Sequence, residues 1–368
     1  MHLSYWEIKN WFTSVDHTIV GSGIVGIHAA LRLREKYPQS KILILEKGFL
    51  PQGASTKNAG FACFGSISEI IEDLKNNSED EVVQLIQKRK RGLELLRKNL
   101  GDESLDFRQY GGWEMFLSDA ELENCLSQFD TVNALLKPLF NSEVFIKTKN
   151  THGFKSITDT MLFNPFEGQV DTGNMMQQLL KKAAAEGILI LNGQTVLSHQ
   201  ETGSGIEIEL NGFSFFTKNV FFATNGFAGG LTLNEVVPAR AQVLITRPIV
   251  GLDIKGTFHL DKGYYYFRNI GDRILFGGGR NLDFQGESTS EFGQTELIQN
   301  KLDELLKQVI LPDRNFEVEH RWSGIMGMGR QKNPIVKQLS DHAFCGVRLG
   351  GMGVAIGSLV GQELADLL

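Results

Sequence analysis

The residues best placed to do chemistry lie near the amino terminus, in the run Gly21-Ser22-Gly23-Ile24-Val25-Gly26. Its glycines have the spacing G-x-G-x-x-G, which allows a tight turn, close approach of the backbone to a diphosphate, and close packing of a helix on a strand. Glu46 follows Gly26 by 20 residues, the separation at which an acidic side chain accepts hydrogen bonds from a ribose hydroxyl. We therefore predict a dinucleotide site, and the acid argues against a 2′-phosphate and hence against NADP.

The elements around this fingerprint run are those that such a site requires. Short buried strands are predicted at residues 18–20 and 41–46, and the apolar spacing between them predicts a helix at residues 24–36. This helix would begin inside the run, so that its free N–H groups and positive end face the diphosphate. A glycine-rich turn followed by a surface glutamate is the structural alternative. FAD and NAD share the pattern, which leaves the choice between them to the rest of the chain.

Composition excludes several classes of function. The 368 residues carry a formal net charge of -6, and their basic and acidic side chains are mostly interspersed. The exception is Lys88-Arg89-Lys90-Arg91, which we interpret as the solvated face of a helix at residues 79–100. We therefore expect no nucleic-acid partner, since such binding needs an extended basic surface.

The cysteines and the first apolar run bear on location. Cys63, Cys125 and Cys345 lack partners at disulfide or metal-ligand spacing, so we expect no metal site and a reducing, cytoplasmic environment. The first apolar run, residues 18–31, contains glycines and has no basic segment before it. It predicts neither a signal peptide nor a membrane span.

A second glycine-containing segment, Gly53-Ala54-Ser55-Thr56-Lys57-Asn58-Ala59-Gly60, resembles the G-A-S-x-x-N-x-G segment of the D-amino-acid oxidase-like family of FAD oxidoreductases, which includes glycine and sarcosine oxidases. Later segments resemble that family in the same order, at residues 195–197, 220–226, 321–324 and 350–354. The resemblance covers nearly the whole chain. It implies a non-covalently bound FAD, since Cys345 does not fall in a matching motif for covalent attachment.

The fingerprint run and the resemblance together predict which residues contact FAD. They are Gly21, Ser22, Gly23, Ile24, Val25, Gly26, Glu46, Lys47, Ala54, Ser55, Asn58, Ala59, Gly60, Val196, Ala223, Thr224, Asn225, Gly226, Gly324, Gly350, Gly351, Met352, Gly353 and Val354. The last five form a glycine loop before a predicted helix at residues 355–368, whose positive end would face the negative charge of reduced flavin. A glycine-rich hairpin that caps a terminal helix is the alternative.

The predicted fold class is α/β, with a Rossmann-type FAD-binding domain and an inserted antiparallel-sheet substrate domain (α+β). We expect residues 1–80, 150–235 and 320–368 in the first domain and residues 81–149 and 236–319 in the second. Further helices are predicted at residues 69–76, 119–139, 172–186 and 290–310, and strands at residues 220–223, 242–246, 263–269 and 273–277. Asn211-Gly212 predicts the tight turn of a hairpin.

The resemblance implies hydride transfer from the carbon next to a neutral amine to flavin N5, then imine hydrolysis and reoxidation, commonly by oxygen to give hydrogen peroxide. Amino-acid oxidases of that family hold the substrate carboxylate with an arginine shortly after the W-x-G element, because a guanidinium binds a carboxylate through two parallel hydrogen bonds. Met326 stands at about that place here. Arg330 is the nearest replacement, and Arg348, Arg240 and Arg268 are further candidates.

Other residues bear on the substrate pocket. Strand alternation points Tyr264 and Tyr266 to one face, where they either line the pocket or belong to the ordinary core. Met326 and Met328 favour a less polar pocket, suited to a polyamine, a secondary amine or a capped amino compound. The eight histidines are scattered, and we interpret them as structural or solvated.

The sequence thus predicts a small-molecule amine or amino acid as substrate and oxygen as electron acceptor. Two alternatives stay open. An NAD-linked dehydrogenase would need a general acid or base opposite the nicotinamide, and no candidate stands out. A binding protein that keeps the FAD fold without turnover is favoured only by the missing arginine.

Overall fold

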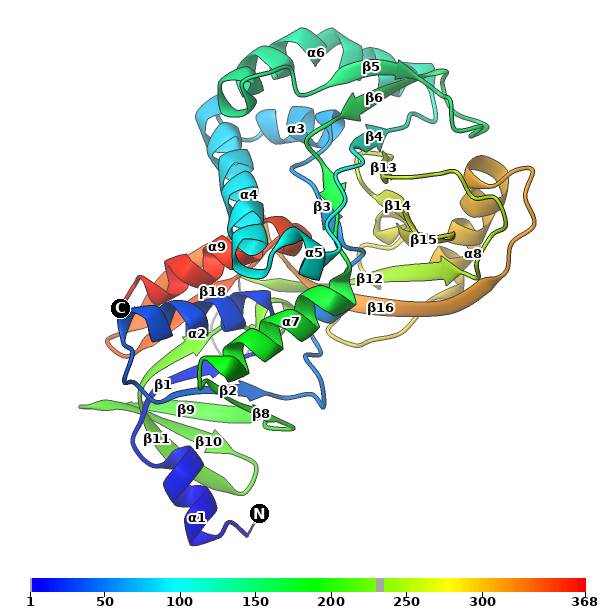
Figure 1. Cartoon of the computed structure of the whole chain (residues 1–368). Coiled ribbons are helices and arrows are strands. Elements are labelled where there is room, and N and C mark those ends of the chain that lie inside the picture. Colours follow the sequence, from blue (N-terminus) through cyan, green and yellow to red (C-terminus); the bar gives the residue numbers. More distant parts are fainter. Residues whose placement is uncertain (1, 230–234) are drawn as a thin grey trace.

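The computed structural model describes residues 2–229 and 235–368, and within them two eight-stranded sheets lie next to each other (Figure 1). In the first sheet the order is β17 (Ile335–Ser340), β18 (Ala343–Val347), β11 (Phe213–Phe222), β1 (Val15–Val20), β2 (Ile42–Glu46) and β8 (Leu189–Asn192), and β10 (Gly205–Leu210) and β9 (Val196–Thr202) extend it from β11. From β18 to β8 all neighbours run parallel. Such strands are covered on both faces, and β2 is buried along its whole length.

Helices α2 (Ile24–Lys36), α9 (Gly353–Ala365), α4 (Glu79–Leu100) and α7 (Thr172–Ala185) pack together over this sheet (Figure 1). Helix α9 can approach α2 closely because Gly361 has no side chain. A Cβ atom there would lie 2.5 Å from the carbonyl oxygen of Val25. The close contact brings the first turns of α2 and α9 to the same side of the sheet, where β1 and β2 end.

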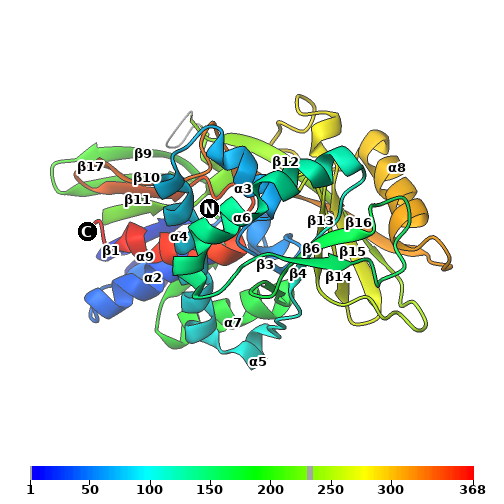
Figure 2. The same cartoon turned by 90° about the horizontal axis from the view of Figure 1, so that it is seen from above.

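The second sheet has the order β16 (Val318–Met328), β12 (Val237–Thr246), β15 (Arg273–Gly278), β14 (Tyr265–Ile270), β13 (Thr257–Leu260), β4 (Gly112–Glu114), β6 (Thr160–Asn164) and β5 (Ile146–Lys149). Its neighbours run antiparallel except β13 and β4. Figure 2 shows β13 to β16 of this sheet to the side of β9, β10 and β11 of the first sheet. Helix α8 (Glu296–Leu305) and the π-helical turn η5 (Leu306–Ile310) pack against it. Phe258, Phe267 and Phe276 fill the core between them.

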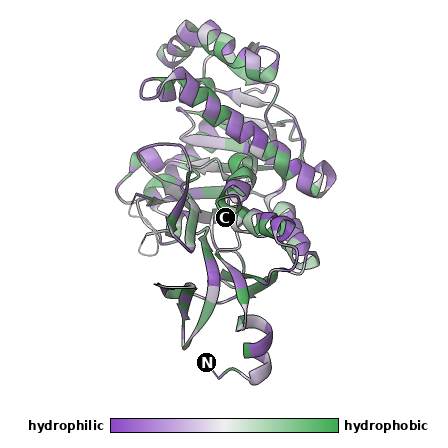
Figure 3. Ribbon diagram, turned by 90° about the vertical axis from the view of Figure 1, so that its left-hand side faces the viewer, coloured by the Kyte–Doolittle hydropathy of each residue, from purple (hydrophilic) through white to green (hydrophobic). Residues whose placement is uncertain are grey.

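The remaining elements connect or flank the two sheets. They are α1 (Tyr5–Glu7), η1 (Ile8–Phe12), η2 (Ala54–Thr56), β3 (Phe61–Ala62), α3 (Ile67–Leu74), α5 (Asp102–Leu105), α6 (Asp119–Phe140), β7 (Gly168–Gln169), η3 (Asn225–Phe227) and η4 (Arg280–Leu282). Hydrophobic and hydrophilic residues alternate along the long helices, as expected when one face of each packs inward (Figure 3). Within the described residues no helix combines the length and apolar composition that crossing a membrane requires.

The predicted combination of a parallel α/β sheet and an antiparallel sheet is confirmed, and so are the strand, helix and strand around the fingerprint run. The hairpin turn at Asn211-Gly212 is also confirmed. The strand predicted at residues 220–223 is not separate, because β11 pairs antiparallel with β10 in its first half and parallel with β1 towards its end. Residues 290–295, predicted as helical, precede the helix instead.

The interpretation of the basic run Lys88-Arg89-Lys90-Arg91 as a solvated helix face was wrong at Arg89. Arg89 does not belong to a solvated helix face, since it is only 4% exposed. Its Nη1 donates a hydrogen bond of 2.6 Å to the carbonyl oxygen of Phe64. The helical spacing placed Arg89 near the apolar stripe of α4, and a partner outside the helix completes the burial of its charge.

Candidate functional site

A cavity of about 660 Å³ lies where the two sheets meet, within the range of roughly 300–1,000 Å³ that is usual for cofactor and ligand pockets. Its wall includes most of the residues that the sequence predicts to contact a dinucleotide, together with Tyr264, Tyr266 and Met326. Four predicted site residues do not line it: Ser22, Gly26, Gly60 and Arg330. The cavity therefore joins the fingerprint run to the predicted substrate residues.

The fingerprint run forms the turn between β1 and α2. Gly21 has φ +107°, a conformation that side chains rarely allow, and a Cβ at Gly26 would collide with the carbonyl oxygen of Gly21. A Cβ at Gly23 would lie 2.8 Å from Ser55 Oγ. Ser55 Oγ also accepts a hydrogen bond of 3.0 Å from Ile24 N–H, and α2 has no side-chain cap at Gly23. Its positive end therefore opens on the cavity, as a diphosphate requires.

Glu46 closes the other side of this turn at the end of β2. Its Oε2 accepts hydrogen bonds from Ser22 N–H at 3.1 Å and Ser22 Oγ at 2.9 Å, and its Oε1 accepts from Gly48 N–H at 3.0 Å. Gln52 N–H donates to the same Oε1 at 3.3 Å. The carboxylate is 5% exposed but lines the cavity, so its place fits a ribose hydroxyl, which would share or replace one of these donors.

The segment at residues 53–60 is held by its own hydrogen bonds. Asn58 Oδ1 accepts from Gly60 N–H at 2.8 Å and from Thr172 Oγ1 at 2.9 Å. Trp322 Nε1 donates to the carbonyl oxygen of Lys57 at 2.9 Å. Ala54, Ser55, Asn58 and Ala59 thereby face the cavity on a fixed backbone.

The glycine loop at residues 350–354 lies against the exit of β11. Asn225 Oδ1 accepts hydrogen bonds from Arg348 N–H at 3.1 Å and Leu349 N–H at 3.2 Å, which ties this exit to the loop. Gly350 and Gly351 have φ of +59° and +82°, and α9 begins directly afterwards without a side-chain cap. A second helix end thus opens on the cavity, in addition to that of α2.

The opposite end of the cavity is formed by the second sheet. Tyr264 and Tyr266 both line it, while Tyr265 and Phe267 belong to the core. Tyr266 lies in β14, whereas Tyr264 lies in the turn that precedes the strand. Burial raises the pKa of Tyr266 to about 12. Met326 and Met328 face the cavity from β16.

Sequence reasoning missed several side chains at this end. Phe61, Cys63, Glu69, His259, Lys262, Arg280 and Lys332 also line the cavity. Phe61, Lys262 and Lys332 lie close in sequence to residues that the sequence analysis singled out, but no motif of known function marks any of the seven. Only Arg280 carries a signal in the sequence, since it follows three glycines at the end of a predicted strand.

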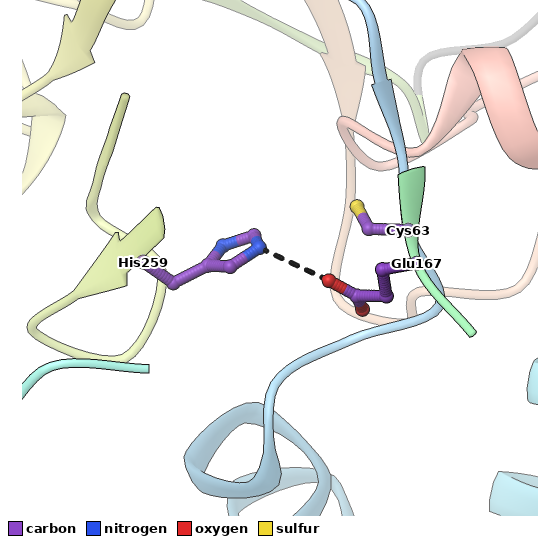
Figure 4. Close-up of side chains that lie close together, drawn as sticks. All are labelled: Cys63, Glu167 and His259. Atoms are coloured by element: carbon purple, nitrogen blue, oxygen red, sulfur yellow. Dashed lines mark ion pairs between the residues drawn. The ribbon is translucent and has the colours of Figure 1, made fainter. Parts of the chain in front are cut away.

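Cys63, Glu167 and His259 meet in the wall at this end (Figure 4). His259 Nε2 lies 3.6 Å from Glu167 Oε2. Burial lowers the pKa of His259, but Glu167, Glu69 and Glu114 outweigh it and the pKa is raised. Burial and nearby carboxylates raise the pKa of the Cys63 thiol well above its usual range, so the thiolate that a metal prefers is disfavoured. We interpret the cluster as a histidine and glutamate pair beside a neutral thiol.

The arginines that the sequence analysis proposed as carboxylate-binding residues do not lie in the cavity wall. Arg330 is exposed in the turn between β16 and β17, because the strand that carries Met326 ends at Met328. Arg240 forms two hydrogen bonds to Glu287, at 2.7 and 2.9 Å. Arg348 Nε donates to the carbonyl oxygen of Asn333, and Arg268 donates to those of Ala59 and Val170. None of the four lines the cavity as described.

Comparisons with known proteins agree with this arrangement. The family model for FAD dependent oxidoreductases matches residues 16–367. A probable oxidoreductase, OrdL, of Haemophilus influenzae is 21% identical over 97% of this chain and 84% of its own. The glycine oxidase of Geobacillus kaustophilus superposes with a TM-score of 0.78 at 20% identity, over 96% of this chain and 94% of its own. The L-proline dehydrogenase of P. horikoshii gives a TM-score of 0.75 at 19% identity, over 96% and 93%.

Proposed function

Because the chain belongs to the FAD-dependent oxidoreductase family, we propose that it oxidises the carbon–nitrogen bond of a small amine or amino acid. The observation that carries this proposal is the cavity itself, whose wall runs from the fingerprint run and Glu46 to Tyr264, Tyr266 and Met326. Family membership also decides between the two cofactors that share the fingerprint, in favour of FAD.

The cofactor contacts follow from the two helix ends. We assign the first turn of α2 to the diphosphate, Glu46 to the ribose, and the backbone near Val196 to the adenine. The glycine loop and the first turn of α9 are assigned to the flavin. Support comes from the N-cap residues Gly23 and Met352, neither of which caps its helix with a side chain. Ser55 Oγ accepts from Ile24 N–H only, and the other first-turn N–H groups at a cavity favour negatively charged groups.

When bound, FAD supplies the acceptor for the hydride that leaves the carbon next to the amine nitrogen. The proposed overall change converts amine, water and dioxygen into a carbonyl compound, hydrogen peroxide and the released nitrogen group, which is ammonia from a primary amine and a primary amine from a secondary one. The chain has to hold a neutral amine in place and exclude water from it. Met326 and Met328 provide apolar surface for this purpose. Because the pKa of Tyr266 is about 12, its hydroxyl keeps its proton at neutral pH and can donate a hydrogen bond to substrate, but cannot serve as a base.

The domain division stays part of the proposal. Residues 1–80, 150–235 and 320–368 would form the FAD-binding domain, and residues 81–149 and 236–319 the substrate domain. Strand β6 and most of β16 lie within the first set of ranges but pair in the second sheet. These two strands therefore link the proposed domains.

The test begins with the purified protein, which is expected to be yellow and to show flavin absorbance. A panel of primary, secondary and polyamines and of amino acids is then added without oxygen, and a substrate is expected to bleach that absorbance. Readmitted air should restore the colour and yield hydrogen peroxide. Protein that binds FAD but is bleached by no amine would instead support the binding protein without turnover. Bleached protein that recovers only with an artificial acceptor would remove oxygen from the proposal.

A further inference from the structure

His259 lies in the cavity wall next to residues that the proposed reaction uses. Its strand, β13, pairs with β14 and β4, and this register sets His259 beside Tyr266 on one side and Glu114 on the other. The ring of Phe61 contacts both aromatic neighbours, with its centroid 5.3 Å from that of His259 and 5.5 Å from that of Tyr266. His259, Phe61 and Tyr266 all line the cavity. The imidazole therefore shares this part of the wall with the hydroxyl that can donate to the substrate.

Cys63 connects the imidazole to the glycine loop that we assign to the flavin. Its Sγ lies 3.7 Å from Sδ of Met352, which belongs to that loop. The same sulfur lies within 4.8 Å of a ring nitrogen of His259, in the cluster drawn in Figure 4. On this assignment, only the Cys63 side chain separates the imidazole from the flavin-binding loop.

The two ring nitrogens of His259 have different surroundings. Nε2 is buried and has no hydrogen-bond partner among the residues that the structure describes. Glu167 Oε2 lies 3.6 Å from it, which is longer than an ordinary hydrogen bond of about 2.7–3.2 Å. Catalytic hydrogen bonds are often long before a substrate binds, so this carboxylate is placed to accept the Nε2 proton and to fix the tautomer. Since Nε2 is enclosed, Nδ1 is the nitrogen whose lone pair a molecule in the cavity can reach.

Three carboxylates act on this imidazole, and each comes from a different element. Glu167 lies just before β7, Glu69 belongs to α3 and Glu114 to β4. Burial lowers the pKa of His259, but the three carboxylates outweigh burial and raise it. A proton that arrives from the cavity therefore meets an imidazole whose charged form is stabilised on several sides.

The neutral groups and the guanidinium at this end of the cavity are poor proton acceptors. Burial raises the pKa of Tyr266 to about 12 and that of Cys63 well above its usual range, so both keep their protons at neutral pH. Arg280 also lines the cavity, but a guanidinium has no lone pair to offer.

The lysines and the remaining carboxylate in this wall are also unsuitable. Lys332 Nζ lies 2.6 Å from Asp73 Oδ1, and Lys262 Nζ lies 3.9 Å from Glu72 Oε2, so their carboxylate neighbours favour the protonated amines. Burial raises the pKa of Glu69, but the cations around it outweigh burial and lower the pKa, which makes its carboxylate a weak base. His259 is therefore the strongest available base at this end of the cavity.

We propose that His259 is a catalytic base whose Nδ1 takes the proton from the substrate ammonium, and that Glu167 is the residue that positions the imidazole. This inference rests on the proposed function. Amines are mostly protonated at neutral pH, and a protonated nitrogen has no lone pair to support the loss of hydride from the adjacent carbon. In the proposed step one N–H bond breaks, its electron pair stays on nitrogen, and the proton passes to Nδ1. Hydride then leaves the carbon for FAD as the C=N bond forms, and the carboxylates balance the charge of the imidazolium.

The first experiment measures the rate of flavin reduction against pH, without oxygen, with the amine of the panel that bleaches the FAD-loaded protein fastest. In the wild type the rate should rise with pH through a pKa above 6.5, as His259 loses its proton. In His259→Gln the amine has to arrive neutral, so the rise should move to the pKa of the free ammonium, about 10 for an alkyl amine. The rate at pH 7 should fall by about 100-fold or more. His320→Gln is the matched control, since His320 does not line the cavity, and it should behave as the wild type.

Glu167→Gln tests the positioning role while the imidazole stays in place. Loss of this carboxylate should lower the pKa of His259, so the rise should move to lower pH by about one unit or more. A residue that only supported the fold would lower the rate at every pH and leave the position of the rise unchanged. Histidine NMR of the FAD-loaded protein measures the same pKa without turnover, and it should show a value above 6.5 in the wild type and a lower one in Glu167→Gln.

The outcomes separate the base from the reaction. The same pH profile in the wild type and His259→Gln would overturn the base but leave the proposed function standing. Should His259→Gln fail to fold, the Glu167→Gln profile decides alone, and an unmoved rise overturns the proposal. A flavin that no amine reduces would remove the proposed function and the base with it, whatever pKa the NMR titration gives.

Discussion

Replacing Gly26 by alanine is expected to damage both stability and FAD binding, although alanine is the better helix former. The new Cβ would collide with the carbonyl oxygen of Gly21, and both groups belong to the backbone, so no flexible side chain can give way. Overpacking of this kind costs about 1–3 kcal/mol, and a backbone collision belongs at the upper end. Alanine returns up to about 1 kcal/mol of helix propensity. The net loss is about 2 kcal/mol, or about 3 °C in Tm for a chain of this length.

The assay measures Tm on the FAD-free protein and the Kd for added FAD by quenching of flavin fluorescence. Gly53→Ala is the matched control, because Gly53 has φ −67° and a Cβ there would meet nothing within 4 Å. The control should have a Tm equal to or slightly above that of the wild type. Since helix α2 has to shift away from Gly21 in the Gly26 variant, FAD should also bind more weakly to it. A Gly26→Ala protein with undiminished Tm would refute the claim that this contact leaves no room for a side chain.

Three further predictions concern buried charges. The pKa of His259 is raised in the folded protein, so its protonated form stabilises the fold. This contribution is complete below about pH 6.5 and is lost as pH rises through the folded pKa. The free energy of unfolding should therefore fall across that range in the wild type and change less in His259→Gln. Burial raises the pKa of Glu114 to about 7, so ionising it destabilises the fold, and Glu114→Gln should remove the part of the pH dependence that lies between about pH 4.5 and 7 in urea titrations. Arg89→Met should lower the free energy of unfolding by about 1.5–3 kcal/mol in the same titrations. Lys88→Met should lower it by less than about 1 kcal/mol, because Lys88 forms only a surface ion pair. Equal effects of the two substitutions would contradict the burial of Arg89.

The nucleotide end of the site could be predicted because its determinants are local. The turn at Gly21, the start of α2 and the acid that ends β2 lie within one strand, helix and strand, and their spacing follows from the geometry of that unit. The same holds for the alternation along β14 that separates Tyr266, at the cavity, from Tyr265 and Phe267, in the core. In both cases the spacing of residues along one short segment determines where their side chains lie.

The substrate end could not be predicted in the same way. His259 and Glu167 come together only when β13 packs beside the segment that leads into β7. No sequence pattern in either segment predicts this contact. Arg330 is close to Met326 in sequence, but β16 ends between them and leaves Arg330 exposed. Arg280 lies far away in sequence and reaches the cavity through the pairing of β14 and β15. Proximity along the chain was therefore the wrong guide to the arginine that lines the cavity.

The wall of the cavity is also assembled from segments made at very different times during synthesis. Gly21 and Glu46 leave the ribosome early, whereas Gly350 to Val354 emerge only after both sheets have been translated. On the proposed assignment of this loop to the flavin, the nascent polypeptide cannot enclose the isoalloxazine until translation has passed the last of these residues. Cofactor capture should then be a late event in biogenesis, and flavin starvation should expose the finished chain, rather than its intermediates, to proteolysis.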